Sequence, residues 1–503
     1  MTMHGLKRTI APLQVLSPAD VELIREGTLH VLEHTGVAFH HERALDVLAE
    51  AGCLVDRDAQ RVRFPAEVVE AALASVPRAG TSRARLHEND LVWGARDETF
   101  LMTGGGMQLV DLQTGQPRQP SRKEFYDLMR LFDALPTVHT LNAFPLFGFT
   151  GVPQAMALVE SCAAKIRMSG KAQAEGSVLG NDRFTLAMGA AVEMDLGCIV
   201  NSVSPLCYDR DAVDKLLYYT DQDAQFGVAA GPLAGTSAPA SLAGAMVLNN
   251  AEIIGGLVLA QVLRPGSVSL PGSMLLMQNM RSGGPFFGSI ANGLAAAACI
   301  QLWREYDLTY GVVTPAFSDS KMLDYQAGTD VASAAMLCCL AGASDIVWHG
   351  GISQQMTAHP VKAVLDDELA TSLGRVLRGV DVDEDSLALD LIDQVGPAPG
   401  SYLGNSHTRA WYKKEAVIPP SADLTPFAGW VEAPPVGILE HAQARIDEIL
   451  ATHTPTPLSD SQEAAIEAIL QEARQYYRSR DLISDAEWSA YEQDLASPEY
   501  PYA

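Results

Sequence analysis

Eight short apolar runs, each followed by a helical stretch, constrain the fold of this chain more than any other feature. Each run carries Gly, Pro, Asn or a charged residue near its end. The runs are ETFLMTGGG (98–106), TLNAFPLF (140–147), KAQAEGSV (171–178), GCIVNSVSPL (197–206), QFGVAAGPLAG (225–235), SVSLPGSM (267–274), YGVVTPAFSDSK (310–321) and SDIVWHGG (344–351). Strand and helix alternating eight times predict a closed parallel barrel of the TIM type, whose functional side chains lie where the strands end.

The segments on either side of the barrel have a different character. Residues 1–97 predict a cap of helices and short strands, and residues 98–380 contain the eight repeats. Residues 381–503 begin with an aromatic and Pro-rich stretch and end in two acidic helices, over about 438–451 and 459–479. The sequence therefore predicts an α/β protein: a TIM (β/α)8 barrel with an N-terminal α/β cap and a helical C-terminal extension.

Local signals place a helix start, a hairpin and a buried helix. Ser121 followed by Glu124 is a capping box, and the Thr-Gly pair ending at Gly115 is typical of a hairpin tip. The longest apolar stretch, 241–263, is interrupted by polar residues that include Glu252. This interruption favours a buried barrel helix over a membrane span.

Charge and cysteine content indicate partners and compartment. The chain has 61 acidic and 35 basic residues, a net charge of −26, so nucleic acid and anionic membranes are excluded as partners by repulsion. An acidic surface also keeps a concentrated protein soluble, and it is compatible with a homo-oligomer. Seven cysteines without paired or metal-like spacing, and an N-terminus without an apolar signal core, predict a cytoplasmic protein with reduced thiols.

Few titratable or strongly polar residues follow the predicted strands. Glu175 follows the third strand, Asn201 lies in the fourth, Asp319 and Lys321 follow the seventh, and His349 ends the eighth. Glu175 and Asn201 are either a polar pair lining the barrel mouth or ordinary supporting residues. His349 is either a site residue or a buried core histidine.

Lys321 also has two interpretations. It is either a Schiff-base lysine at the barrel mouth or the salt-bridge partner of Asp319 or Asp324. The Gly run that includes Gly104 and Gly105 either cradles a phosphate or forms a tight turn. The sequence contains no HExxH motif, GxSxG motif or clustered His/Asp set, so we expect neither metal hydrolysis nor serine-triad chemistry, and no metal bound by this chain.

Aromatic residues gather near the strand ends although they make up only 7% of the chain. The aromatic candidates for site residues are Tyr208, Phe286, Phe317 and Trp348. An aromatic cavity with carboxylates nearby and no strong nucleophile suits a ligand with a fixed positive charge. Any barrel also packs aromatic residues beneath its loops, so each of them has a purely structural alternative.

Four stretches resemble the trimethylamine methyltransferase family. They are MTGGGMQLVDLQTGQPRQPSRKEF (102–125), GPLAGTSAPASLAGAMVLNNAEIIGGLVLAQVLRPGSVSLPGS (231–273), AFSDSKMLDYQAGTD (316–330) and the WHGG of the last strand. The resemblance extends over about 15–480. It implies a barrel that passes a methyl group from an amine to cobalamin, which a small separate corrinoid protein carries and which this chain does not hold permanently.

The resemblance also bears on the substrate. Archaeal trimethylamine enzymes of this family contain pyrrolysine, whereas every residue here is standard. The equivalent position is expected near Gln326 to Gly328, ahead of a helix over 329–342. The chain is thus similar to the pyrrolysine-lacking branch, which acts on quaternary amines such as glycine betaine. The strand ends expected to face the corrinoid are Gly104, Gly105, Gly231, Gly272, Gln326 and Gly328.

The chemistry of a quaternary amine agrees with the scarcity of bases and nucleophiles. Its demethylation releases a neutral tertiary amine, so the leaving group needs no proton, and the protein has to orient one N–CH3 bond and exclude water. Asn201, His349, Lys321 or backbone amides of the Gly-rich strand ends would hold a carboxylate tail. A Schiff-base lyase using Lys321 and a non-catalytic quaternary-amine-binding protein remain as alternatives.

Overall fold

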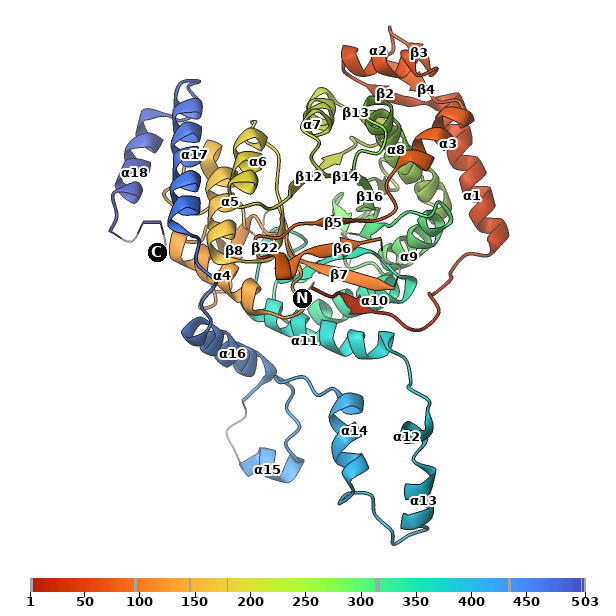
Figure 1. Cartoon of the computed structure of the whole chain (residues 1–503), viewed down its shortest axis with the longest axis vertical. Helices are drawn as coiled ribbons and strands as arrows, with labels where there is room; N and C mark the ends of the chain where they lie inside the picture. The colour runs from red at the N-terminus through yellow and green to blue at the C-terminus, as the bar shows by residue number, and fades with distance from the viewer. Residues whose placement is uncertain are drawn as a thin grey trace.

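A closed barrel of parallel strands forms the centre of the molecule (Figure 1). The computed structural model describes residues 3–94, 97–143, 146–178, 180–312, 317–432, 436–498 and 500–501. In barrel order the strands are β7 (Glu98–Thr103), β10 (Thr140–Leu141), β11 (Ala172–Ala174), β12 (Leu196–Asn201), β14 (Phe226–Ala230), β16 (Ser269–Ser273), β19 (Gly311–Val312) and β20 (Asp345–His349). β20 pairs back with β7 and closes the barrel. Each predicted run overlaps one of these strands, so the predicted fold class is confirmed.

In the described part of the chain, eight helices surround the barrel. They are α4 (Arg122–Ala134), α5 (Ala157–Met168, preceded by the 3-10 turn Gln154–Met156), α6 (Asp182–Ala191), α7 (Arg210–Asp221), α8 (Leu242–Leu263), α9 (Ile290–Glu305), α10 (Tyr325–Ala341) and α11 (Pro360–Leu377). The predicted capping box opens α4: Glu124 N donates to Ser121 Oγ over 3.2 Å, and Ser121 N donates to the Glu124 carboxylate over 2.8 Å. α10 begins at Tyr325 and not at the predicted 329, because the Asp324 carboxylate accepts from Ala327 N and caps the helix.

An α/β cap packs against one side of the barrel. It contains α1 (Pro18–His30, continued by the π-helical turn Val31–Thr35), α2 (Glu42–Glu50), α3 (Ala66–Ser75), β2 (Val37–Phe39), β3 (Leu54–Asp56) and β4 (Arg61–Arg63). β13 (Cys207–Tyr208), which follows β12, joins this sheet beside β2. Cap helices cover one side of α8 and barrel strands the other, which explains why α8 is apolar all round. α8 is the one described helix whose length and composition would suit a membrane span, and 72% of that stretch is buried in the protein.

A short hairpin lies below the N-terminal ends of the barrel strands. It consists of β5 (Gly80–Ser82) and β6 (Leu91–Trp93), joined through the 3-10 turn His87–Asn89. Leu91 and Trp93 reach the bottom of the barrel lumen. β1 (Leu6–Lys7) pairs antiparallel with the start of β7 at the same end. We call this end the floor and the opposite end, where the strands finish, the mouth.

Small sheets surround the mouth. β8 (Gln108–Val110) and β9 (Pro117–Arg118) form the predicted hairpin with Gly115 at positive φ, and they join β21 (Gly351–Ile352) and β22 (Thr357–Ala358). β15 (Leu233–Ala234), β17 (Leu276–Gln278) and β18 (Pro285–Phe286) form a second group. The loop after β7 is therefore paired with the loop after β20, and the loop after β14 with the loop after β16.

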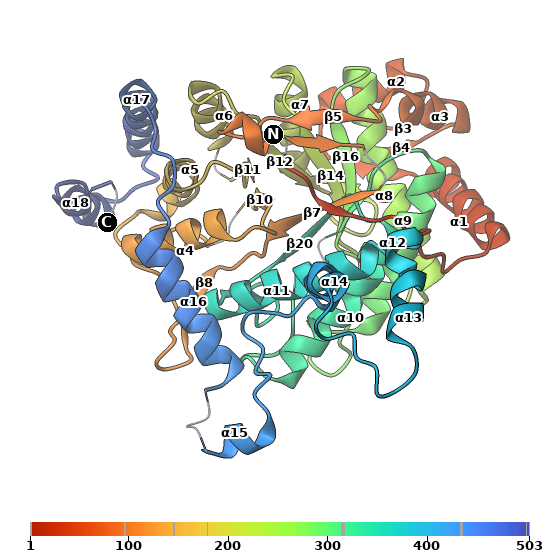
Figure 2. The same cartoon turned by 60° about the horizontal axis from the view of Figure 1, so that its bottom comes forward.

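The C-terminal part first leaves the barrel and then returns to it. α12 (Glu384–Leu387), α13 (Leu389–Val395), α14 (Ser406–Ala416) and α15 (Phe427–Glu432) hang below α11 in Figure 1. α16 (Ile438–Thr452) then packs on α11 and α4, as Figure 2 also shows, and α17 (Asp460–Arg478) packs on α5 and α6. These two helices match the two predicted. The sequence prediction missed the short helices before them and α18 (Asp485–Leu495) at the end.

Candidate functional site

A cavity of about 190 Å³ occupies the barrel lumen. Side chains of a strand point alternately into the lumen and toward the outer helices. TIM barrels usually fill the lumen with bulky branched residues. Here many inward positions are Gly or Ala, which leaves space: Ala172, Ala174, Gly197, Gly227, Ala229, Gly272 and Gly311.

One carboxylate lies in the wall of this cavity. Asp345 is the only charged side chain among the described lining residues. Ser344 Oγ donates to its Oδ1 over 2.8 Å, and burial raises the pKa of the carboxyl. A Cβ at Gly311 would overlap Asp345 Oδ2, so glycine is what lets this carboxylate fit beside β19. A largely apolar wall with one carboxylate favours a cationic ligand.

Further polar atoms in the cavity wall are available to a ligand. Thr140 Oγ1, Trp93 Nε1 and both side-chain amide atoms of Gln173 are buried and have no hydrogen-bond partner among the described residues. Buried polar atoms are normally paired, and an unpaired one costs about 1–3 kcal/mol. A ligand with an acceptor oxygen would satisfy one or more of the donors among them.

An aromatic pair lies at the mouth end of the cavity. Phe317 and Phe287 pack edge to face with their ring centroids 5.6 Å apart, in one cluster with the lumen residues Met102 and Val347. The predicted Phe317 therefore packs beside lumen residues, although neither ring is among the residues that line the cavity. Phe286 lies next to this pair on β18 and is 39% exposed. Phe287, which was not selected from the sequence, is the ring that contacts Phe317.

Hydrogen bonds join three mouth loops. The Asp319 carboxylate accepts from Gly288 N over 2.8 Å and from Gln354 Nε2 over 3.1 Å. Gln354 Nε2 also donates to the Pro285 carbonyl. Ser353 and Gln354 have φ of 50° and 64°, left-handed values that non-glycine residues rarely adopt and that often mark functional segments. Asp319 and Gln354 thus hold the loops after β16, β19 and β20 together.

Glu175, predicted to line the mouth with Asn201, points away from the lumen. It follows Ala174, which lines the cavity, so strand alternation turns it toward α5. There it is buried and forms an ion pair of 2.6 Å with Lys165. Asn201 is two residues past the cavity-lining Ile199 and is exposed at the mouth. The structure therefore separates the predicted polar pair.

Trp348, His349 and Tyr208 also lie outside the lumen. Trp348 Nε1 donates to the Asp366 carbonyl of α11, because Trp348 alternates with the cavity-lining Val347. The pairing of β20 with β7 shifts between Val347 and His349, which pairs His349 with Thr103. His349 Nε2 lies 2.9 Å from Thr137 Oγ1, and burial lowers the pKa of the ring to about 3. Of the two interpretations of His349, the buried core histidine describes this position.

Tyr208 belongs to the interface between barrel and cap. Its ring stacks on Phe39, and its hydroxyl donates to the Glu252 carbonyl over 2.9 Å. The Glu252 carboxylate, also buried, accepts from Ser202 and Ser204. This placement separates Tyr208 from the cavity.

Lys321 is exposed, and its hydrogen bond goes to neither of the carboxylates predicted as its salt-bridge partners, those of Asp319 and Asp324. Its Nζ donates to the backbone carbonyl of Asp319 over 2.5 Å, while the Asp324 carboxylate caps α10. Lys321 is absent from the residues lining the described cavity. Among the described residues, no group of three or more His, Cys, Asp or Glu side chains could hold a metal ion.

The predicted corrinoid-facing positions divide into three groups by their burial. Gly104 and Gly105 are buried at the end of β7, where a Cβ on Gly104 would come within 2.5 Å of the His349 carbonyl, so this run is a tight turn packed inside the protein. Gly231 and Gly272 are half-buried at the ends of β14 and β16. Gln326 and Gly328 are exposed in the first turns of α10.

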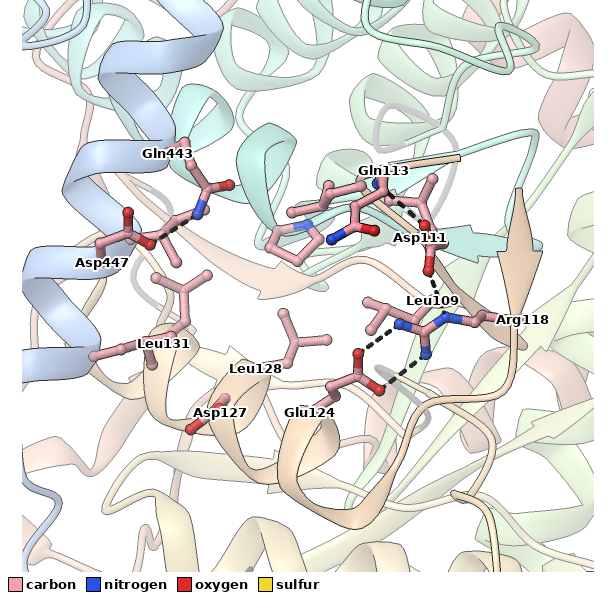
Figure 3. A pocket seen from close by; sticks show the side chains of 15 residues that line it. Leu109, Asp111, Gln113, Arg118, Glu124, Asp127, Leu128, Leu131, Gln443 and Asp447 are labelled. Atoms are coloured by element: carbon pink, nitrogen blue, oxygen red, sulfur yellow. Dashed lines mark hydrogen bonds and ion pairs between the residues drawn. The ribbon is translucent and has the colours of Figure 1, made fainter. Parts of the chain in front are cut away.

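A larger hollow of about 380 Å³ lies outside the barrel between the β8–β9 hairpin, α4 and α16 (Figure 3). At its hairpin side the charges are paired, because Arg118 donates to both Asp111 and Glu124. The Arg118 guanidinium lowers the pKa of both carboxyl groups. At its α16 side Asp447 accepts from Gln443 Nε2. The Arg118 cluster offers no free charge to a ligand, and the hollow lies outside the barrel, so the lumen is the better candidate site.

The family model described as trimethylamine methyltransferase (MTTB) matches residues 1–476 of the chain. The glycine betaine methyltransferase of Desulfitobacterium hafniense (strain Y51) is 31% identical over 470 residues, which cover 91% of this chain and 96% of that protein. Trimethylamine methyltransferase MttB of D. hafniense (strain DSM 10664 / DCB-2) is 27% identical over 478 residues, which cover 93% and 95%. Among solved structures, Methanosarcina barkeri monomethylamine methyltransferase (MtmB) aligns with a TM-score of 0.43 and 13% identity, covering 91% of this chain and 92% of that one.

Proposed function

This chain belongs to the trimethylamine methyltransferase family and is a methyltransferase for a methylated amine, and from that premise we propose that its substrate is a quaternary amine, a betaine such as glycine betaine. We further propose that the methyl acceptor is the cobalt(I) of cobalamin on a separate corrinoid protein. The observation that carries the substrate proposal is the lumen cavity with its single carboxylate, Asp345.

The cavity has the features that a trimethylammonium group requires. Its size of about 190 Å³ suits a small molecule, and its wall is largely apolar. Asp345 supplies a negative charge, and a bound cation would favour the ionised form that burial disfavours. The Phe317 and Phe287 rings at the mouth end offer cation–π contact, worth about 0.5–2 kcal/mol for each ring face.

The unpaired donors suggest where a betaine carboxylate would bind. Thr140 Oγ1, Trp93 Nε1 and Gln173 Nε2 are the donors available to it, while Asp345 attracts the ammonium group and repels the carboxylate. This arrangement replaces His349 and Lys321, the anchors expected from the sequence, because neither lines the described cavity.

Methyl transfer then needs orientation rather than acid or base catalysis. The electron pair of the acceptor forms the new bond to the methyl carbon, and the C–N pair stays on nitrogen, which leaves as a neutral tertiary amine without a proton. The residues of this chain bind the cation, align one N–CH3 bond with the mouth and exclude water. The mouth beside β12 is accessible, since the cavity-lining Ile199 is 37% exposed and Asn201 above it is exposed.

A Schiff-base lyase has no geometric support. Lys321 is exposed, and its Nζ donates to a backbone carbonyl on the outside of the mouth loop. A covalent amine chemistry would require that group beside the substrate. We therefore retain the methyltransferase and set the lyase aside.

Binding measurements test the substrate proposal. Isothermal titration with glycine betaine, trimethylamine and dimethylglycine should show tight binding for the quaternary amine alone. A charge pair about 5 Å apart at an effective dielectric of 20 contributes about 3 kcal/mol, so Asp345→Asn should raise the betaine Kd by about 10- to 150-fold. Ser344→Ala, which keeps the carboxylate, is the matched control and should change Kd by less than about fivefold. Unchanged betaine binding in Asp345→Asn would disprove the proposed lumen site.

A further inference from the structure

Exposed apolar side chains gather on one side of the barrel mouth, around the loops after β16 and β19. α9 and α10 begin there, and their first residues, Ile290 and Tyr325, are 57% and 87% exposed. Large apolar side chains are usually buried, and a helix normally begins with small or polar residues. Six exposed side chains form the surface that we call the lip: Met280, Phe286, Ile290, Leu294, Met322 and Tyr325.

The elements that carry the lip adjoin one another and the cavity. The Asp319 carboxylate, in the loop after β19, accepts from Gly288 N, just before α9. α9 and α10 pack along each other from this end of the barrel onward. Phe287, which follows the lip residue on β18, packs in one cluster with Met102 and Val347 of the cavity wall. The lip therefore lies beside the mouth end of the lumen.

The loops around the lip lack negative charge, although the chain is strongly acidic. Of the 503 residues 61 are acidic, yet none occurs in the loops after β14, β16 and β20, at 231–241, 274–289 and 350–359. In the loop after β19, the Asp319 and Asp324 carboxylates already accept from backbone N–H groups.

Two exposed cations flank the lip, Arg281 and Lys321. Among the described residues, neither has a carboxylate as its ion-pair partner, and Lys321 Nζ donates to a backbone carbonyl. Charged residues are depleted at the centre of protein interfaces and are found around the rim. The lip thus suits a partner that buries apolar surface and presents carboxylates to these two side chains.

The exposed area of the lip suits a partner that binds and leaves. With about 150–200 Å² for a fully exposed large side chain, the six residues together expose roughly 600 Å². Transient complexes bury less than about 1,200 Å² in total, whereas stable ones bury about 800 Å² on each partner. A partner held permanently on the lip would also cover the mouth, through which a methyl acceptor has to reach the substrate.

We propose that the lip is the docking surface of the methyl acceptor, a corrinoid-carrying protein that approaches the mouth from the side of α9 and α10. This inference rests on the proposed function, which supplies the acceptor. The contact face of that protein is apolar at its centre and acidic opposite Arg281 and Lys321. It leaves after each transfer, and the mouth is then open to the next substrate.

Two acceptors separate docking from chemistry: free cobalamin and a corrinoid protein reconstituted with cobalamin, both reduced to cobalt(I) and offered to the full chain with glycine betaine. The parent should methylate the protein-borne cobalamin with the higher kcat/KM. Ile290→Glu/Tyr325→Glu should raise the KM for the corrinoid protein at least about tenfold, since interface anchors each contribute more than about 1 kcal/mol. The kcat/KM for free cobalamin and the betaine Kd should change less than about twofold, because neither residue lines the cavity.

The matched control is Val178→Glu. Val178 is 42% exposed in the loop after β11, and β11 lies across the barrel from β19. This variant should leave the constants for both acceptors unchanged. Both lip substitutions lie in the first turn of a helix, where a carboxylate is favourable, so the double variant should fold like the parent.

A charge variant provides a second test. Arg281→Gln/Lys321→Gln changes only exposed side chains and should raise the KM for the corrinoid protein several-fold. It should also remove most of the dependence of that KM on ionic strength, while the circular dichroism spectrum stays unchanged.

Four results would overturn the proposal. They are equal kcat/KM of the parent for the two acceptors, lip variants that use the corrinoid protein as well as the parent does, an equal loss in Val178→Glu, and a sedimentation coefficient of the chain alone that falls in Ile290→Glu/Tyr325→Glu, which would assign the lip to a second copy. A parent that cannot demethylate betaine with free cobalamin would instead reject the proposed function. Calorimetric binding of the corrinoid protein to the parent and to the lip variant would still decide the docking.

Discussion

Replacing Lys165 by Met should destabilise the protein because it leaves a buried carboxylate without its partner. Lys165 and Glu175 are both buried, and their charged groups lie 2.6 Å apart between α5 and β11. Lys165 Nζ also donates to the carbonyls of Asn142 and Ala174, so it holds the ends of β10 and β11 at the mouth. Burial raises the pKa of the Glu175 carboxyl, which Lys165 lowers again.

Removing one partner of a buried pair costs about 3–5 kcal/mol. An unfolding entropy of about 2.1 cal/mol/K per residue amounts to roughly 1 kcal/mol/K for this chain, so Lys165→Met should lower Tm by about 3–5 °C. Lys165→Met/Glu175→Leu removes both charges and should recover most of the loss, since an apolar replacement of a buried pair is often nearly neutral. Differential scanning calorimetry at pH 7 measures all three proteins.

Lys171→Met is the matched control. Lys171 is also buried, but its Nζ donates to the backbone carbonyls of Phe132 and Leu135, so its loss should cost only about 1–2 kcal/mol. A Lys165→Met protein as stable as the parent, or a double variant as unstable as the single one, would refute the reasoning that the unpaired Glu175 charge causes the loss.

Three further predictions concern pH, positioning and the aromatic residues. Burial lowers the pKa of His139 and His349 to about 3, so the unfolded chain takes up protons before the folded one as pH falls from about 6.5 toward 3, and each ring should remove about 1.4 kcal/mol of stability per pH unit. His349→Gln should reduce this pH slope of the unfolding free energy in urea titrations, and an unchanged slope would contradict the prediction. Gln354→Ala should lower kcat at least about tenfold with KM nearly unchanged, because Gln354 fastens the mouth loops, and a normal kcat would remove this role. Phe317→Leu should raise the betaine Kd several-fold, whereas Trp348→Leu should lower Tm and leave the betaine Kd unchanged. Equal effects of the two variants on Kd would contradict the placement of Phe317 beside the substrate and of Trp348 outside the lumen.

The barrel could be predicted from the sequence because its signals are local. Each strand is a short apolar run bounded by turn residues, and the capping box at Ser121 and Glu124 is readable from spacing alone. The predicted start of α10 at 329 is too late because that prediction leaves out Asp324 as the N-cap residue. The short helices α12 to α15 escaped prediction because they lack a sustained apolar period.

The candidate site was predicted less well, since it depends on which face of a strand each residue occupies. Alternation from Ala174 could have assigned Glu175 to the outside, but a shift of pairing such as the one before His349 is invisible in the sequence. Asp345 was overlooked because it begins its strand rather than ending it. The bond between Gln354 and Asp319 joins residues 35 positions apart in separate loops, and no local pattern announces it.

The most direct test of the proposed activity is the stoichiometry of methyl transfer under anaerobic conditions. The purified protein, glycine betaine and a corrinoid acceptor reduced to cobalt(I) are mixed, and dimethylglycine is quantified by mass spectrometry against the methylated acceptor. We predict equal amounts of both products, no product from trimethylamine, and strongly reduced turnover in Asp345→Asn at subsaturating betaine. Efficient demethylation of trimethylamine with betaine left intact would contradict the account.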